Sequence, residues 1–123
     1  KFIKIYNTRI LIFKAPVSEP PEPPKELKKI LQLTKDLAIK NNSKLYFIYL
    51  PEYYRYTKKY NNNNYNAVKN IINELEIPFV DIHKQVFEKE QYPLKLFSFE
   101  QFGHYNIEGY KKVAETIYRT AKD

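Results

Sequence analysis

Apolar residues recur at helical spacing in three segments of the chain, and this pattern predicts three amphipathic helices. Residues 25–40 place leucine and isoleucine on one face and lysine on the other. Residues 64–76 and the segment that follows Asn106 show the same period. The residues expected on the three apolar faces are Leu27, Ile30, Leu31, Thr34, Leu37 and Ala38; Tyr65, Val68, Ile71, Ile72 and Leu75; and Tyr110, Val113, Ala114, Ile117 and Ala121.

Two short apolar runs between turn signals predict β-strands. Residues 45–51, LYFIYLP, are almost continuously apolar, which is typical of a strand buried on both faces and ended by Pro51. Residues 78–82, PFVDI, form the second run. Because a helix joins the two runs, they are most simply parallel, with a right-handed crossover. The order helix, strand, helix, strand, helix therefore predicts an α/β architecture.

The remaining segments are less regular. Residues 2–13 fit a helix with Ile3, Tyr6, Ile10 and Phe13 on one face, although Phe2, Ile3 and Ile5 could also begin a strand. We favour the helix. The successive prolines of residues 15–24 predict a linker or surface loop. Residues 52–64 and 91–103 are expected to be loops, with a weak helix or turn around Val86 and Phe87.

Composition restricts the class of protein. A length of 123 residues suits one small domain, and a hydrophobic content of 43% is too high for a disordered chain. The absence of cysteine excludes disulfide frameworks and thiolate metal sites. No segment reaches the roughly 18 apolar residues of a membrane span. The chain starts at Lys1 and lacks methionine, so we expect a processed or partial polypeptide, and the sequence indicates no compartment.

The net charge of +7 raises the question of an acidic partner. Tyrosines alternate with Arg55, Lys58 and Lys59 in the loop 52–64, and such a pattern can stack bases and bind phosphates. The same pattern is also typical of a solvated loop after a strand. The lysines are spread along helix faces instead of being clustered, so we favour a compositional bias and do not favour nucleic acid as a partner.

His104 is the main candidate for chemistry. It lies two residues before Asn106, whose side chain is a good N-cap for the last helix. Histidine exchanges a proton near neutral pH, and a general base also needs an acceptor that orients its second nitrogen. Glu100 and Asp81 are the two candidate acid partners. The alternatives are a structural or merely exposed histidine, and an Asp81 that caps the segment after its strand.

The predicted topology gives this histidine a location. Sites in parallel sheets form at the carboxyl ends of the strands. Pro51 and Asp81 lie at such ends, and the loop of His104 follows the second strand, so it can return to the same edge. A metal site of His83, Asp81 and His104 has no recognised ligand spacing, so we expect no metal.

Other kinds of site lack their usual sequence signals. Ser18, Ser43 and Ser98 do not lie in a Gly-x-Ser-x-Gly turn. Gly103 and Gly109 are the only glycines, so a phosphate-binding glycine loop is absent and no cofactor is expected.

The segment from His104 to Ala114 resembles the closing block of the SGNH (GDSL-type) hydrolases: a histidine, an asparagine, a Gly-Tyr pair that opens the last helix, and an alanine. The stretches KLYFIYLPEYYRY and IPFVDIHKQVF resemble the fourth and fifth strands of that family, and FIKIYNTRILIF resembles one of its helices. The resemblance covers most of the chain but only the C-terminal half of the family's domain.

The resemblance implies a three-layer, flavodoxin-like parallel sheet, with residues 1–123 as one partial domain. It also implies hydrolysis or transfer of an acyl ester on a small molecule or polymer. By the resemblance, His104 is the base that takes a proton from a serine nucleophile. The family's acid stands three residues before the histidine, where this chain has Gln101. Glu100 is a candidate replacement, and a dyad is the other option.

The family's serine, glycine and asparagine blocks have no counterpart here, so we expect this chain alone to be inactive. The nucleophile would come from a missing N-terminal half or from another chain. That partner would cover an exposed apolar edge of the sheet. The alternative is a non-catalytic α/β domain that binds a partner or a polysaccharide through its tyrosine-rich surface.

Overall fold

The computed structural model of the chain describes residues 22–57 and 60–122. The predictions for residues 2–13 and for most of 15–24 lie outside these ranges. The described part contains helices α2 (Leu27–Lys40), α3 (Asn63–Glu74), α4 (Ile82–Gln85) and α5 (Ile107–Lys122), strands β1 (Phe47–Tyr49) and β2 (Phe79–Asp81), and the short 3₁₀ helices η1 (Tyr53–Tyr56), η2 (Phe87–Lys89), η3 (Pro93–Leu96) and η4 (Ser98–Glu100).

The two strands form a parallel pair, as the sequence pattern predicts. Ile48 lies opposite Val80 in the register, and the Phe47 N–H donates to the Pro78 carbonyl oxygen at 2.9 Å. Helix α3 connects the strands, which confirms the predicted strand–helix–strand order and an α/β architecture. Both strands are shorter than the apolar runs that predicted them. A flavodoxin-like sheet needs more strands than residues 22–57 and 60–122 supply.

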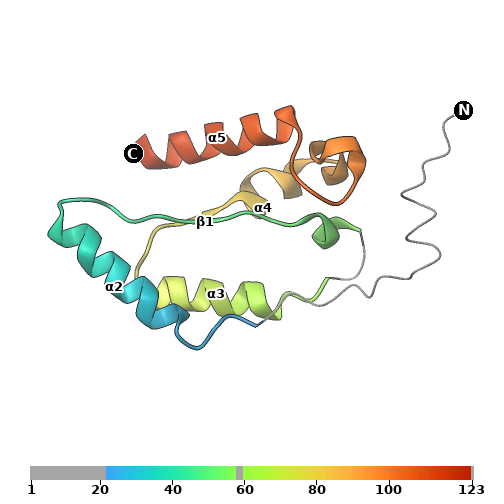
Figure 1. Ribbon diagram of the computed structural model, residues 1–123. Helices are drawn as coiled ribbons and strands as arrows, with labels where there is room; N and C mark the ends of the chain where they lie inside the picture. Colours follow the sequence, from blue (N-terminus) through green and yellow to red (C-terminus); the bar gives the residue numbers. More distant parts are fainter. Residues whose placement is uncertain (1–21, 58–59, 123) are drawn as a thin grey trace, which may run out of the picture.

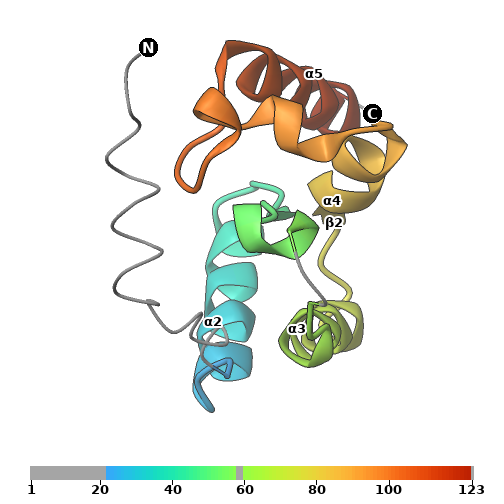
Figure 2. The same ribbon diagram turned by 90° about the vertical axis from the view of Figure 1, so that its right-hand side faces the viewer.

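Helices lie on both sides of the strands. Figure 1 shows α2 and α3 on one side of β1 and α5 on the other, and Figure 2 shows the same arrangement after a turn of 90°. Because side chains alternate along a strand, each side has its own apolar cluster. The cluster toward α2 and α3 contains Ile72, Leu75 and Ile77, and the cluster toward α4 and α5 contains Val80, Ile82, Val86, Phe87, Leu96, Phe97, Tyr105 and Val113.

Strand β1 differs from its prediction in one respect. Its apolar run predicts burial on both faces, but Ile48 is 37% exposed and Leu50, just beyond the strand, is 52% exposed. On the other face, Phe47 stacks on Phe79 with ring centroids 6.0 Å apart. The described helices therefore cover one face of β1 and leave the other partly open.

Parts of the apolar faces of α2 and α5 are also exposed. In α2, Ile30 and Leu37 are 54% and 60% exposed, although both belong to the predicted apolar face. In α5, Val113 is buried as predicted, whereas Tyr110 is 51% exposed. The helical periodicity thus locates both helices correctly, and the described part of the chain covers only part of each apolar face.

The predicted loops contain short helical turns. The weak helix expected around Val86 and Phe87 consists of α4 followed by η2, while the predicted loops 52–64 and 91–103 contain η1, η3 and η4. None of the helices among the described residues combines the length and the apolar character that a membrane crossing requires.

Candidate functional site

The loop that carries His104 is fixed on both sides. The His104 carbonyl oxygen accepts a hydrogen bond from the Ser98 N–H at 3.0 Å, and the Asn106 N–H donates to the Leu96 carbonyl oxygen at 2.9 Å. The buried Tyr105 hydroxyl donates to the carbonyl oxygen of Pro51 at 2.5 Å. Since Pro51 follows β1, the loop returns to the carboxyl end of the strands, as predicted.

Helix α5 begins as the sequence predicts. The Asn106 side-chain oxygen accepts from the Gly109 N–H at 2.9 Å, and its amide nitrogen donates to the Lys95 carbonyl oxygen at 2.7 Å. Gly109 itself is packed closely, because a Cβ at this position would lie 2.5 Å from the Leu96 carbonyl oxygen. The start of α5 is therefore held against the segment that precedes the loop.

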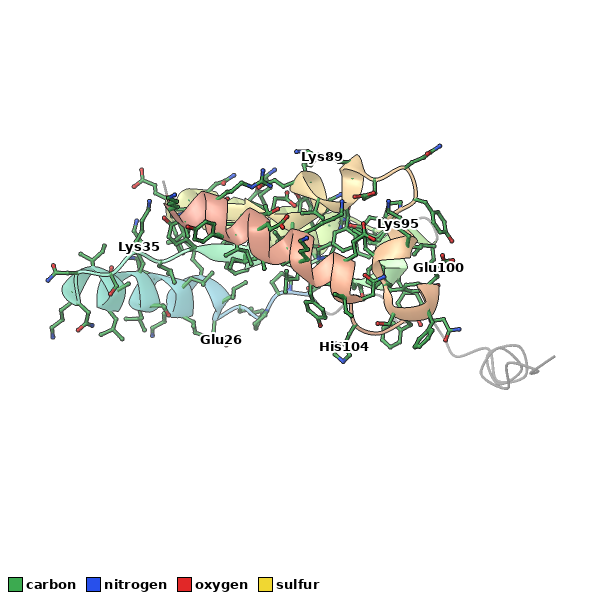
Figure 3. All side chains as sticks on the ribbon, turned by 90° about the horizontal axis from the view of Figure 1, so that it is seen from above. Glu26, Lys35, Lys89, Lys95, Glu100 and His104 are labelled. Atoms are coloured by element: carbon green, nitrogen blue, oxygen red, sulfur yellow. The ribbon has the colours of Figure 1, made fainter. Side chains whose placement is uncertain are left out.

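The side chain of His104 is exposed, and Figure 3 shows it pointing away from the ribbon. Within the described ranges, its imidazole has no hydrogen-bond or ion-pair partner. Gly103, directly before it, has a φ of +142°, and a Cβ there would meet no atom within 4 Å. His104 thus stands on a firmly attached loop with open space around its backbone and side chain.

Glu100, one candidate acid partner, makes other contacts. Its carboxylate accepts a hydrogen bond from the Tyr92 hydroxyl at 3.3 Å, and its carbonyl oxygen accepts from the Tyr53 hydroxyl at 3.1 Å. In Figure 3, Glu100 and His104 lie at different sides of the loop. The Tyr53 contact is a second link between this loop and the segment after β1.

Asp81, the other candidate, is buried and acts as a cap. Its carboxylate accepts from the Lys84 N–H at 3.2 Å at the start of α4 and from the Tyr65 hydroxyl in α3. The capping interpretation of Asp81 is therefore confirmed. Neither of these hydrogen bonds involves His104.

His83 belongs to a separate, mostly buried group that sequence reasoning missed. Its Nδ1 lies 3.0 Å from the Tyr56 hydroxyl oxygen, and its Nε2 lies 3.7 Å from a Glu88 carboxylate oxygen. Burial, reinforced by the positive charge of Arg55, lowers the pKa of His83 below the usual 6.5. The neutral imidazole therefore bridges a carboxylate and a phenol within the fold. His83 and Glu88 are five residues apart in the chain, and this spacing gave no signal for the Tyr56 contact.

Arg55 lies among three tyrosine rings at the same end of the sheet. Its guanidinium carbon is 4.7 Å from the ring centroids of both Tyr60 and Tyr65 and 5.7 Å from that of Tyr49. It also donates to the Asn62 side-chain oxygen at 2.7 Å. These contacts join Arg55 to side chains of β1, of α3 and of residues 60 and 62, which supports a structural role for this arginine over a role in stacking bases.

Aromatic side chains surround the loop of His104. Tyr54 stacks on Phe102 with ring centroids 5.0 Å apart, and Phe102 is 56% exposed. Phe99 is 89% exposed and has a φ of 55°, in the left-handed region that non-glycine residues rarely adopt. The backbone of η4 therefore directs an aromatic ring into solvent on the segment that precedes His104.

The side chains of His83, Asp81 and His104, which we considered from the sequence as a metal site and did not favour, are not brought together. No group of three or more metal-ligating side chains occurs among residues 22–57 and 60–122. His83 contacts Tyr56 and Glu88, Asp81 caps α4, and His104 faces solvent.

Two pockets lie away from these residues. One, of about 210 Å³, is lined by charged residues of η2 and α5 such as Lys89, Glu90 and Arg119. The other, of about 260 Å³, lies between α2 and the turn that follows α3 and includes Ile39 and Ile77. In the first pocket Glu90 pairs with Lys95 and Lys112 at 2.6 and 2.7 Å, and both ion pairs lower the pKa of the Glu90 carboxyl.

Comparison of the chain with protein-family models, with curated proteins and with solved structures gives no match.

Proposed function

We propose that this chain is the C-terminal part of an SGNH-like ester hydrolase in which His104 is the general base. The observation that carries the proposal is the hydrogen bond from Tyr105 to Pro51, because it attaches the loop of an exposed histidine to the carboxyl end of a parallel strand pair. In the proposed enzyme, further strands complete a flavodoxin-like sheet. The substrate is an acyl ester on a small molecule or a polymer.

The chemistry requires a nucleophile in addition to the base. His104 would take the proton of a serine hydroxyl as the oxygen attacks the ester carbonyl, and would then deliver it to the leaving group. Among the described serines, the Ser98 hydroxyl donates to the Tyr105 carbonyl oxygen and Ser43 lies in the turn after α2. The nucleophile in this proposal therefore belongs to a segment that precedes Lys1 or to another chain.

The acid partner of His104 would also differ from the acid of a standard catalytic triad. Glu100 is the nearer candidate in sequence, and its exposed carboxylate accepts a hydrogen bond from the Tyr92 hydroxyl at 3.3 Å. To orient His104, this carboxylate would have to leave the Tyr92 hydroxyl and accept from the imidazole instead. Asp81 is buried under Tyr65 and serves as a cap, so we assign the acid role to Glu100 or to no residue.

The test uses the complete natural polypeptide that contains this chain, with a short-chain nitrophenyl ester as substrate. We expect His104→Ala to lower kcat/KM by about 10²–10⁴-fold, the contribution of a general base. Lys111→Ala, a change at another exposed position in the helix α5 that follows the loop, should leave the rate unchanged. Equal rates for the wild type and His104→Ala would exclude His104 as the base.

A non-catalytic binding domain is the second candidate, and the exposed aromatic rings near His104 favour it. Tyr54 stacks on the exposed ring of Phe102, and Phe99 is a further exposed ring on the same segment of the chain; such rings can stack on sugar rings or on an apolar partner. A fluorophosphonate probe separates the two functions, because it labels an activated serine. Labelling of the complete protein would reject the non-catalytic function. Absence of labelling, together with polysaccharide binding that Phe99→Ala weakens, would support it.

A further inference from the structure

A polar pocket of about 210 Å³ lies between α5 and the segment that contains η2. The side chains that α5 contributes to its lining recur at three- and four-residue spacing, so they share one face of the helix. They are Lys112, Glu115, Thr116 and Arg119, and the other segment contributes Lys89 and Glu90. Charged groups from two separate segments thus meet in this pocket.

The pocket is separate from the candidate base and its candidate acid partners. None of His104, Glu100 and Asp81 lines it. In Figure 3, Lys89 lies on one side of α5 and His104 lies on the other. A ligand of this pocket would therefore lie apart from the proposed ester.

The carboxylate of Glu90 is already neutralised within the fold. One of its oxygens lies 2.6 Å from Lys95 Nζ, and the other lies 2.7 Å from Lys112 Nζ. The Glu90 side chain is 14% exposed, so salt screens these ion pairs less than it screens pairs on the open surface. Two cations therefore face one carboxylate at this end of the pocket.

Lys89 and Arg119 add two further positive charges, and Glu115 adds the second carboxylate of the lining. Together with Lys95, which binds Glu90 from outside the lining, four cations oppose two carboxylates in this part of the described chain. Such an excess of like charge is unfavourable unless an anion balances it. A ligand with two negative charges would neutralise the site.

The guanidinium of Arg119 is oriented by its own helix. Its Nη2 donates to the Thr116 hydroxyl at 3.5 Å, and its Nε donates to the Glu115 carbonyl oxygen at 3.4 Å. Thr116 is only 4% exposed, and its hydroxyl donates to the Lys112 carbonyl oxygen at 2.8 Å, which fixes the acceptor. A guanidinium has five N–H donors. Within the described ranges, three of those of Arg119 have no protein acceptor and can bind a ligand.

Lys89 supplies a second cation that the fold leaves unpaired. Its exposed ammonium group has no hydrogen-bond or ion-pair partner among residues 22–57 and 60–122. An arginine presents a planar fork of donors, whereas a lysine presents a compact point charge. A phosphate group suits both, because arginine can bind two of its oxygens at once and lysine binds it through charge.

We propose that this pocket binds a dianionic phosphate group, with Arg119 and Lys89 as its main contacts and Lys112 as a third positive charge. The pocket is smaller than the roughly 300–1,000 Å³ of pockets that enclose drug-sized ligands. The ligand is therefore inorganic phosphate, or a phosphate monoester whose remainder extends into solvent. The proposal does not depend on the proposed enzymatic function.

The test is equilibrium dialysis of radiolabelled inorganic phosphate against the complete natural polypeptide that contains this chain, at constant ionic strength. We expect saturable binding with a dissociation constant on the order of 1 mM, since the contacts are charge-assisted but open to water. Arg119→Gln and Lys89→Gln should each weaken binding on the order of 10-fold, which is the loss of one hydrogen bond to a charged group. Lys111→Gln removes the same charge at an exposed position of α5 outside the pocket and should leave binding unchanged.

Two results would overturn the proposal. One is the absence of saturable binding. The other is equal weakening by Lys111→Gln and Arg119→Gln, because phosphate would then respond only to the general attraction of a chain with a net charge of +7.

Two further measurements refine the assignment. Arg119→Lys keeps the charge and removes the planar fork, so it should weaken binding more than Lys111→Gln does. Displacement of bound phosphate by phenyl phosphate would support a monoester as the natural ligand, and its failure to displace would support free phosphate.

Discussion

The hydroxyl of Tyr105 donates a hydrogen bond to the carbonyl oxygen of Pro51, and both residues are buried. This contact joins the residue after the candidate base to the residue that ends the β1 segment. It therefore couples the position of His104 to the sheet.

Removal of this hydroxyl tests the coupling. Tyr105→Phe leaves a buried carbonyl oxygen without its donor, so we expect a loss of about 1–3 kcal/mol in the free energy of unfolding, measured by urea denaturation. Tyr118→Phe makes the same change on a ring that is 65% exposed and should alter stability by less than about 0.5 kcal/mol. Similar stabilities for the two variants would show that the contact is not made in solution.

Substitutions of the two candidate acid partners are expected to have different effects on stability. Asp81→Asn weakens the acceptor for the Lys84 N–H and the Tyr65 hydroxyl, so it should destabilise the protein by about 1–2 kcal/mol. Glu100→Gln affects an exposed carboxylate and should change stability by less than about 0.5 kcal/mol. If Glu100 orients His104, its variant lowers ester hydrolysis without lowering stability. A stable Asp81→Asn protein would contradict the capping role.

The buried position of His83 predicts a pH dependence of stability. Its pKa in the folded protein is below the usual 6.5, because burial and Arg55 disfavour the protonated form. As the pH falls below about 6.5, the unfolded chain binds a proton that the folded protein does not, so the free energy of unfolding decreases until the pH reaches the folded-state pKa. Urea denaturation between pH 7.5 and 5 measures the slope.

Substitution of each histidine separates their contributions. His83→Gln should reduce the slope in this pH range, whereas His104→Gln, at an exposed position, should leave it unchanged. An equal reduction in both variants would be inconsistent with the environment of His83.

Gly109 is predicted to tolerate no side chain. A Cβ at this position would lie 2.5 Å from a backbone oxygen, that of Leu96, and 3.0 Å from the Tyr105 Cβ. Although alanine favours helices by about 1 kcal/mol over glycine, we expect Gly109→Ala to destabilise the protein by about 1–3 kcal/mol through overpacking. Thermal unfolding measures the change, and Lys111→Ala is the control. A rise in Tm for Gly109→Ala would refute the close contact.

The features predicted correctly from the sequence are those with a local cause. Periodicity located α2, α3 and α5, and the short apolar runs located β1 and β2. The Asn106 cap depends on a side chain and an N–H three residues apart, so it is also visible in the sequence. The return of the His104 loop to the strand ends followed from the direction of the two strands.

The features that were missed depend on contacts between distant segments. Helix α3 and strand β2 lie between Tyr56 and His83 in the chain, so no sequence spacing connects them. The exposure of Ile48 and Leu50 was missed because an apolar run indicates only that a strand can be buried on both faces. It does not indicate whether another segment covers those faces. The contact of Glu100 with Tyr92 depends on the left-handed backbone of η4, which a phenylalanine and a glutamate do not signal.

The chain has two glycines, and they are required for different reasons. At Gly109 the backbone is ordinary helix, and it is the neighbouring atoms that exclude a side chain. A compensating change in those neighbours can therefore restore the stability of a variant substituted at this position. At Gly103 the surroundings are open and the φ of +142° alone excludes a side chain, so no change elsewhere in the packing can compensate. A search for second-site suppressors should therefore recover revertants of substitutions at position 109 and none at position 103.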